Sequence, residues 1–471
     1  MKIERSLIIL FCSIHFVLGL DINTVSVSMP AIAEYFKVTP SEASRVIWIY
    51  FVVLTSLLVT FGKIGDLKGF KKLYMLGIGI FTIGALFNAI ANELNLLILF
   101  RIFQAIGASI LFSLTPALIS HSFHQTGTGR VFGLNYAFTA LGGIIGRVFS
   151  GYIIQWFSWR GVFLISIPFG IIGLILAIIF IKEKIGKSEK TKFDFIGALL
   201  IFIFLFSLLS SINVVYDAQQ QFLQITMLVI VCLISGVLFI INERKKSLQK
   251  TQLINWKLLK GKKLLSPIIS FAYIYIITNG VIYITPFFLR YKWEYEPKLV
   301  GLVMAVPSVF QMISGYYGGR FSDYLNIRKI CFVATVILTA SLLFYIVISY
   351  IHNDILLGIT LCIYGTAIGL FIPANTNRIM LSTPADSKGS VSSLMTTTIR
   401  IGSAIGTALF AGVFSLIIPK STNQLLETPA DLLNWGFSLT FLVGLLISLL
   451  AVITTFYSSD NSKKSPQARK P

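Results

Sequence analysis

The sequence predicts an all-α integral membrane protein that crosses the bilayer about fourteen times. Of its 471 residues, 55% are hydrophobic and only 12% are charged, whereas a soluble domain has roughly 25% charged residues. Apolar runs of about 20 residues recur along the whole chain, and each is long enough to cross a hydrocarbon core of about 30 Å as a helix. We predict helices because the backbone in lipid must satisfy its hydrogen bonds internally.

Six apolar segments form the first group of predicted spans. They lie at residues 7–29, 46–61, 73–91, 96–120, 131–157 and 162–181. The first has no small-residue cleavage site and continues through Asp21 to Pro30, so we interpret it as a retained span and not as a removed signal peptide. Residues 1–181 therefore form the predicted amino-terminal six-span bundle.

Two further spans are predicted at 195–214 and 222–241, inside a linker that covers residues 182–263 and is charged at both ends. The linker is followed by the last six predicted spans, at 264–289, 300–317, 330–351, 356–377, 391–418 and 437–457. Residues 264–457 form the predicted carboxy-terminal bundle. The tail at 458–471 is polar and basic, and we predict that it is disordered.

The basic residues follow the predicted spans. The formal net charge is +20, from 39 Lys and Arg against 19 Asp and Glu. With the amino terminus inside, most basic residues fall in cytoplasmic segments, as the positive-inside rule requires. We expect a multi-pass protein of the bacterial cytoplasmic (inner) membrane with both termini in the cytoplasm. We expect no nucleic-acid partner, because no basic cluster lies in a soluble domain.

A short motif occurs twice, 257 residues apart, between the second and third spans of each bundle. The shared positions are a glycine, an aspartate and a basic residue: Gly62, Asp66 and Lys71 in the first copy, and Gly319, Asp323 and Arg328 in the second. A small residue lets two helices approach, while an aspartate at a helix end meets basic groups. Such a contact can break and re-form, so we predict a conformational latch in each half of a parallel repeat.

In this repeated motif and in several other segments, the sequence resembles the major facilitator superfamily. It resembles more narrowly the fourteen-span drug:proton antiporter branch of that family, which includes tetracycline and quaternary-ammonium exporters. The matching pieces are residues 20–24 and 29–30 in the first span, the latch at 62–72, residues 101–107 in the fourth span and residues 142–151, followed by Trp159, Arg160, Phe163 and Pro168. One position departs from the antiporter motif, because Arg147 stands where the family has a proline.

The resemblance implies a major facilitator fold of two six-helix bundles with two extra central helices. It further implies a secondary active transporter without cofactors, which uses the proton gradient to export amphipathic drugs or toxic metabolites by alternating access. The expected partners are a small-molecule substrate, protons and membrane lipids, and we expect a monomer.

Charged residues inside predicted spans are the candidate functional groups. Asp21 is the only acidic residue deep in a span, and Arg101, Arg147 and Arg400 are the basic ones. Each costs roughly 2.5 to 3.5 kcal/mol at mid-membrane unless it meets a partner or a wet cavity. An Asp–Arg pair about 4 Å apart gains about 4 kcal/mol at an effective dielectric constant near 20, so pairing offsets this cost.

We predict that Asp21 pairs with Arg147, which lies at a similar depth, and keep Arg101 as the alternative partner. Two cations beside one acid favour the charged form of Asp21 and leave the site net positive. Asp21 would then carry a proton only after separating from an arginine, or the second arginine would meet an anionic substrate. A fixed cluster that only ties spans together is the structural alternative. Gln104 and Arg400 complete the candidate proton-coupling or substrate residues.

Small residues surround Arg147 in the fifth span. Gly142, Gly143, Gly146 and Gly151 lie on one side of the predicted helix, and such stripes permit close helix packing. In the thirteenth span Arg400 precedes two further glycines, and we interpret it as a candidate counterpart of Arg147.

Other function classes lack their signatures. The sequence contains no phosphate-cradling Gly-rich Lys-Ser/Thr loop and no His-Glu-x-x-His motif, so we predict neither an enzyme nor an ATP-driven pump. His121 and His124 have no accompanying Cys or carboxylate cluster, so we assign no metal site. The alternative function is transport of an anionic metabolite through a net-positive Asp21, Arg101 and Arg147 site.

Overall fold

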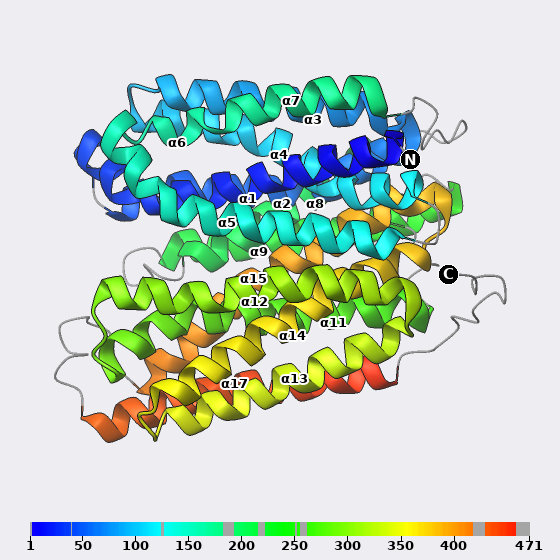
Figure 1. Cartoon of the computed structure of the whole chain (residues 1–471). Helices are drawn as coiled ribbons and strands as arrows, with labels where there is room; N and C mark the ends of the chain where they lie inside the picture. Colours follow the sequence, from blue (N-terminus) through cyan, green and yellow to red (C-terminus); the bar gives the residue numbers. More distant parts are fainter. Residues whose placement is uncertain are drawn as a thin grey trace.

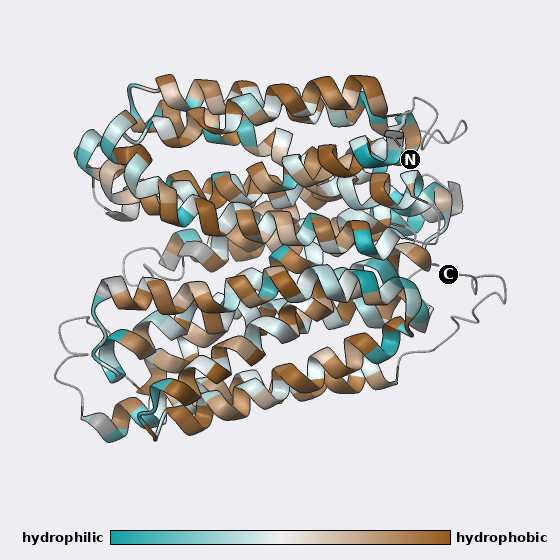
Figure 2. Ribbon diagram, viewed as in Figure 1, coloured by the Kyte–Doolittle hydropathy of each residue, from teal (hydrophilic) through white to brown (hydrophobic). Residues whose placement is uncertain are grey.

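The structure is a computed structural model that describes residues 2–38, 40–123, 127–181, 193–214, 222–249, 252–254, 261–417 and 429–457. Within these ranges every regular element is a helix, and 14 helical segments are long and apolar enough to cross a membrane. Hydrophobic residues cover most of each helix, and hydrophilic residues gather toward the helix ends (Figure 2). The predicted all-α fold with fourteen spans is therefore confirmed. The predicted disordered tail lies outside the described residues.

The first group of helices is α1 (Lys2–Phe36), α2 (Pro40–Lys68), α3 (Phe70–Ile90), α4 (Leu94–Ser122), α5 (Thr128–Phe157), and the short α6 (Gly161–Leu164) that continues into α7 (Ser166–Phe180). Two central helices follow, α8 (Phe195–Val214) and α9 (Phe222–Gln249). The last group is α11 (Lys262–Phe287) with the π-helical turn η2 (Phe288–Lys292), α12 (Pro297–Tyr324), α13 (Ile327–Ile348), α14 (Asp354–Leu381), the 3-10 turn η3 (Ala385–Ser387), α15 (Lys388–Ile417) and α17 (Ala430–Phe456).

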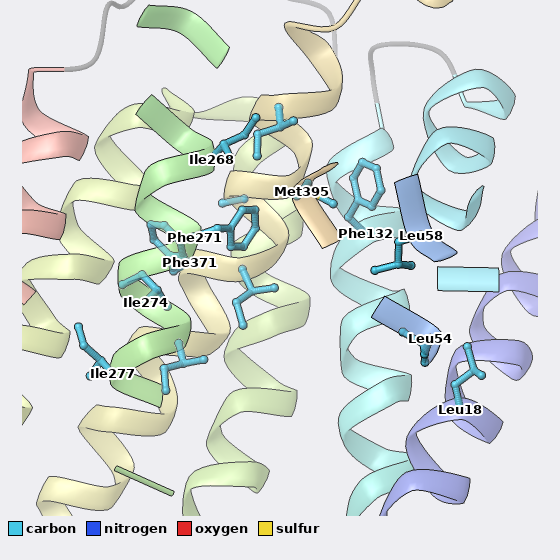
Figure 3. Close-up of a cluster of buried hydrophobic side chains, with 14 of the residues drawn as sticks. Leu18, Leu54, Leu58, Phe132, Ile268, Phe271, Ile274, Ile277, Phe371 and Met395 are labelled. Carbon is cyan, nitrogen blue, oxygen red and sulfur yellow. The ribbon is translucent and has the colours of Figure 1, made fainter. Parts of the chain in front are cut away.

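The two groups of helices lie side by side with their long axes aligned, and α1 begins at the same end of the bundle at which α17 ends (Figure 1). We call this the termini end. Between the groups, α5 packs along α12 and α2 packs along α15. Buried apolar side chains from both groups form one core, in which Leu54 and Leu58 of α2 lie on one side and Ile268 and Phe271 of α11 on the other (Figure 3).

The central helices lie at one side of the junction between the two groups. Helix α8 packs on α9 and on α2, and it also contacts α15. Ala198, Ile201 and Leu205 of α8 share an apolar cluster with Val59 of α2, and Ile401 of α15 packs against that cluster. Helix α8 therefore contacts both groups and covers the α2–α15 junction on that side.

The observed helices are longer than the apolar runs from which they were predicted. Helix α2 continues to Lys68 and α12 to Tyr324, because a helix need not end where the hydrocarbon core ends. Asp66 and Asp323 consequently lie in the last turns of these helices and not in the connecting turns where the sequence analysis placed them.

Glycines of α5 lie directly against α1. A Cβ atom added at Gly142 would lie 2.1 Å from the Phe16 carbonyl oxygen, and one at Gly146 would lie 2.9 Å from that of Leu20. Gly143 faces the Asn23 side chain, whose Nδ2 would lie 3.0 Å from such a Cβ. Only small residues permit this approach of the two helices.

Gly151 is different from the three glycines that contact α1, because a Cβ added there would meet no atom within 4 Å. Its predicted helix-packing role is wrong in this structure, since Gly151 lies on an exposed face of α5 while its neighbour Ser150 is buried. The regular spacing of the glycines in the sequence could not reveal which of them face a neighbouring helix.

We expect Gly142→Ala to lower the thermal stability of the purified protein and Gly151→Ala to leave it unchanged or raise it slightly. Overpacking at a helix contact costs about 1 to 3 kcal/mol, whereas alanine in an open helical position is up to about 1 kcal/mol better than glycine. Thermal unfolding in detergent, followed by tryptophan fluorescence, measures both variants. Equal midpoints for the two would show that α1 and α5 do not pack as closely as described.

Candidate functional site

Asp21, Arg101 and Gln104 form a closed cluster between α1 and α4, and all three side chains are fully buried. Arg101 Nη1 donates to Asp21 Oδ2 at 3.1 Å and to Gln104 Oε1 at 2.6 Å, and Gln104 Nε2 donates to Asp21 Oδ1 at 3.2 Å. Arg101 and Gln104 share a face of α4 because they are three residues apart. Asn88 of α3 adds a donor to Gln104 Oε1 at 2.7 Å. The buried carboxylate is thus fully engaged.

The guanidinium group of Arg101 is held from several helices. It lies 4.1 Å from the ring centroid of Tyr50 in α2 and 5.6 Å from that of Phe163 in α6, and its Nε donates to the Val46 carbonyl at 3.5 Å. Cation–π contacts in a desolvated setting contribute up to about 2 kcal/mol. The cluster therefore ties α1, α2, α4 and α6 together and carries no net charge.

The predicted Asp21–Arg147 pair is not formed. Arg147 is an exposed side chain whose Nε donates to Asn23 Oδ1 at 2.9 Å. Asn23 is two residues after Asp21, and two residues turn a helix by about 200°, so the two side chains point to nearly opposite faces of α1. Helix α5 packs on the Asn23 face and α4 on the Asp21 face. Arg101 is the partner of Asp21, as the alternative prediction had it.

Arg400 of α15 lines a cavity of about 280 Å³ between the two groups of helices. Its guanidinium carbon lies 5.4 Å from the ring centroid of Phe51 in α2 and 4.8 Å from that of Phe112 in α4. Its Nε is buried without a hydrogen-bond partner, and no carboxylate in the described ranges forms an ion pair with it. The cavity thus contains an unneutralised cation.

The cavity is bounded by α2, α8, α11 and α15. Besides Arg400, its polar lining comes from Thr55 of α2, Asn279 of α11, and Ser403 and Thr407 of α15, while Leu209 and Ile212 of α8 form an apolar wall. Helix α8 therefore contributes to the cavity, although the sequence analysis treated the two central spans only as an insertion.

Arg147 and Arg400 do not occupy matching positions of the two halves. Arg147 lies 18 residues beyond Gly129 and Arg400 lies 11 residues beyond Gly389, although these two glycines occupy equivalent helix starts. A difference of seven residues is about 10 Å along a helix. The predicted correspondence between the two arginines is wrong, and Arg400 lies nearer the termini end.

Asp66 fastens α2 of the first group to α15 of the second. Its carboxylate accepts from the backbone N–H of Gly389 and of Ser390, both at 2.7 Å, and from the Ser390 hydroxyl at 2.6 Å. The first N–H groups of a helix have no partner within the helix, and the helix dipole favours negative charge there. The partner of Asp66 is therefore a helix amino terminus and not the basic groups that the sequence analysis expected.

Asp323 makes the reciprocal contact from α12 to α5. Its two oxygens accept from the backbone N–H of Gly129 at 2.7 Å and of Arg130 at 2.8 Å. Each group of helices thus presents an aspartate to the start of the fifth long helix of the other. Together the two contacts join the groups at the termini end.

Glycines allow these junctions to close. A Cβ added at Gly62 would lie 2.4 Å from the Gly389 carbonyl oxygen, and one at Gly319 would lie 2.3 Å from that of Gly129. Both glycines stand four residues before their aspartates, which is one helical turn. The glycine and the aspartate of the motif therefore serve the same helix junction.

Unlike the glycine and the aspartate, the basic residues of the motif bind helix ends within their own group. Lys71 Nζ donates to the Ile178 carbonyl near the end of α7 at 2.9 Å, and an Arg328 Nη2 hydrogen bond reaches the Phe456 carbonyl at the end of α17. Carbonyls in the last turn of a helix lack partners within it. Each basic residue thus stabilises the last long helix of its own group.

The histidines give no sign of a metal site. In the described ranges no three His, Cys, Asp or Glu side chains gather closely enough to hold a metal ion. His15 packs edge-on against Phe112, with ring centroids 5.7 Å apart, and His124 lies outside the described residues.

Sequence reasoning missed several contributors to the site: Asn88, Tyr50, Phe51, Phe112, Gly129 and Gly389. A signal existed for the last two, since a glycine occurs just inside the start of both fifth long helices. The aromatic residues had no signal, because aromatic side chains are common in every span.

Comparison with known proteins gives consistent results. The family model described as the Major Facilitator Superfamily matches residues 11–407. The chain is 28% identical over 465 residues to the riboflavin transporter RibZ of Clostridioides difficile, covering 99% of this chain and all of the relative. It is 23% identical over 414 residues to the multidrug resistance protein Stp of Mycobacterium tuberculosis, covering 88% of this chain and 76% of that protein. It is 25% identical over 462 residues to the multidrug transporter protein MdtP of Bacillus subtilis, covering 96% and 83%.

Two solved structures are similar in fold. The human organic anion transporter MFSD10 superposes with a TM-score of 0.65 at 12% identity, covering 96% of this chain and 97% of that chain. The proton:xylose symporter XylE superposes with a TM-score of 0.62 at 13% identity, covering 95% of both chains.

Proposed function

The chain belongs to the Major Facilitator Superfamily, and from this premise we propose that it is a secondary active transporter that exports amphipathic small molecules in exchange for protons. Membership of this family makes it a multi-pass membrane transporter and not an enzyme. The alternating units of the proposal are the bundles at 1–181 and 264–457, with the linker at 182–263 between them.

The observation that carries the proposal is the reciprocal latch. Asp66 and Asp323 each hold the start of a helix in the opposite group, so the termini end is closed while Arg400 lines a cavity between the groups. Hydrogen bonds to a charged group contribute about 1.5 to 3 kcal/mol each, which is small enough to be exchanged during a transport cycle. Alternating access requires such a reversible closure.

For proton coupling we propose Asp21. In the closed cluster its carboxylate accepts hydrogen bonds from Arg101 and Gln104. A rearrangement that withdraws Arg101 would leave a buried carboxylate without its cation, and such a group takes up a proton. Coupling would then need no cofactor other than the proton gradient.

Relatives named as multidrug resistance or multidrug transporters support export of amphipathic compounds. The alternative is transport of an anionic metabolite. The net-positive site that was predicted for it is not formed, because Asp21 neutralises Arg101, while Arg147 forms a hydrogen bond to Asn23. Arg400 lines the cavity without an ion pair among the described residues, and this observation favours an anionic substrate as the alternative.

We also propose that the protein lies in the bacterial cytoplasmic membrane as a monomer, with the termini end in the cytoplasm. The excess of basic residues in the segments at this end supports that orientation. Reporter fusions after Phe180 and after the last residue should both report a cytoplasmic location. A periplasmic signal from either fusion would contradict the arrangement.

A susceptibility screen tests the transport function. A pump-deficient bacterial host that expresses the chain should tolerate several amphipathic drugs or metabolites better than the same host with an empty vector. Everted membrane vesicles should then accumulate one protecting compound when a proton gradient is imposed, and an uncoupler should abolish the uptake. Protection that persists unchanged with the uncoupler would contradict proton coupling.

A further inference from the structure

Arg400 is a half-buried cation at the cavity between the two groups of helices. Asp21 and Arg101 form a salt bridge at 3.1 Å and cancel each other. Arg400 has no such partner in the described ranges, and its Nε is buried without an acceptor. A cation in this setting is stabilised when a negative group enters its cavity, because no carboxylate that lines the cavity neutralises it.

The polar side chains near Arg400 are already hydrogen-bonded. Ser403 and Thr407 stand three and seven residues after Arg400, so they share its face of α15. Asn279 Nδ2 donates to Ser403 Oγ at 2.8 Å, and the Ser403 and Thr407 hydroxyls donate to the backbone carbonyls of Ile399 and Ser403. An acceptor group that enters the cavity would therefore meet the guanidinium of Arg400 as its donor.

Tyr50 connects the cavity with the buried acid cluster. Its ring lies beneath Arg101, and its buried hydroxyl has no hydrogen-bond partner and interacts electrostatically with both Asp21 and Arg400. A negative group that binds Arg400 therefore changes the electrostatic environment on the same side of α2 as Asp21.

The remaining walls favour a flat apolar body. Phe51 and Trp48 of α2 line the cavity, with the Phe51 ring centroid 5.4 Å from the guanidinium carbon of Arg400, and Leu209 and Ile212 close it from α8. Aromatic rings stack on such surfaces. The volume of about 280 Å³ is at the lower limit of ligand pockets, roughly 300 to 1,000 Å³, and suits one or two fused rings.

We propose that the cavity at Arg400 binds small planar aromatic anions, with the acidic group on the guanidinium of Arg400 and the ring between the aromatic side chains of α2 and the apolar side chains of α8. This deepens the proposed transport function and rests on it for its physiological meaning. An inorganic anion would leave the apolar walls unused, and an organic cation would be repelled by Arg400.

The test compares two probes of almost the same shape, the anion 2-naphthoate and the neutral 2-naphthamide. Their equilibrium binding to the purified full-length protein in nanodiscs is measured against empty nanodiscs, which corrects for partition into lipid. Wild type should bind 2-naphthoate about ten- to a hundredfold more tightly than 2-naphthamide, as expected for hydrogen bonds to a charged group. Acetate should not compete at the same concentrations.

Four variants separate the effects of charge, shape and fold. Arg400→Gln should lose most of the preference for 2-naphthoate while its affinity for 2-naphthamide changes less than about twofold, and Arg400→Lys should retain part of the preference. Leu209→Trp, which fills the cavity from α8 without changing its charge, should weaken the binding of both probes. Arg244→Gln removes one arginine charge from an exposed position on α9 and should change the affinity for neither probe.

Four results would overturn the proposal. They are equal binding of the two probes by wild type, undiminished preference in Arg400→Gln, equal loss of both probes in that variant, and competition by acetate. If Arg400→Gln does not fold, the preference of wild type for 2-naphthoate and the probe binding of Leu209→Trp still test the proposal. Binding is measured without a gradient, so failure here leaves the transport proposal standing, and failure of the susceptibility screen leaves the binding result standing.

Discussion

Replacing Asp66 by asparagine should open the termini end of the transporter and lower its transport rate by at least about tenfold. The carboxylate accepts three hydrogen bonds at the start of α15. Asparagine removes the charge and turns an NH2 group toward at least one of these donors. If two bonds to the charged group are lost, the closed state loses about 3 to 6 kcal/mol, and about 5.5 kcal/mol suffices to invert a 99:1 population.

Asp323→Asn should act in the same direction but less strongly, because Asp323 accepts from two backbone groups and no hydroxyl. Spin labels at Lys72 of α3 and Tyr324 of α12, both exposed, report the separation of the two groups by double electron–electron resonance in nanodiscs. The four native cysteines are first replaced by alanine. The separation should lengthen in either variant.

Asp431→Asn is the matched control, because Asp431 is an exposed aspartate in the first turn of α17, at the opposite end of the bundle. Its transport rate and label separation should equal those of wild type. Wild-type rates in both latch variants, with unchanged separations, would remove the latch from the mechanism.

Arg101→Ala should be among the most destabilising single substitutions in the chain. It removes the cation from the fully buried Asp21 and also a donor from Gln104. Breaking a buried ion pair by removing one partner costs about 3 to 5 kcal/mol, because the remaining charge stays uncompensated. We expect a low yield in membranes and a clearly lower unfolding midpoint in detergent.

A second substitution should relieve part of this loss. Asp21→Asn removes the stranded charge, so the double variant should be more stable than Arg101→Ala alone, with an interaction energy of up to about 3 kcal/mol. Asp21→Asn and Arg147→Ala should instead be additive, since Arg147 bonds to Asn23. Thermal unfolding of the six proteins in the two cycles measures both couplings. Additivity in the first cycle, or coupling only in the second, would assign Arg147 as the partner.

The number of spans follows from the sequence alone, because each apolar run has the length that a membrane requires and lipid leaves the backbone no alternative to a helix. The sequence also located the duplicated motif, since Asp66 and Asp323 recur with their glycines at a fixed offset. The apolar runs did not predict where the helices end. Polar residues can continue a helix beyond the hydrocarbon core, as α2 does to Lys68.

Which charges meet depends on how the helices pack and does not follow from the sequence. Asp21 has arginines at similar depth on both sides, and depth does not distinguish them. The packing of α4 on one face of α1 and α5 on the other assigns Arg101 to Asp21 and Arg147 to Asn23. The helix starts that receive Asp66 and Asp323 lie more than 190 residues away in sequence. Arg400 remains unneutralised for the same reason, because burial and pairing depend on the faces that neighbouring helices present, and the order of residues along one helix does not contain that information.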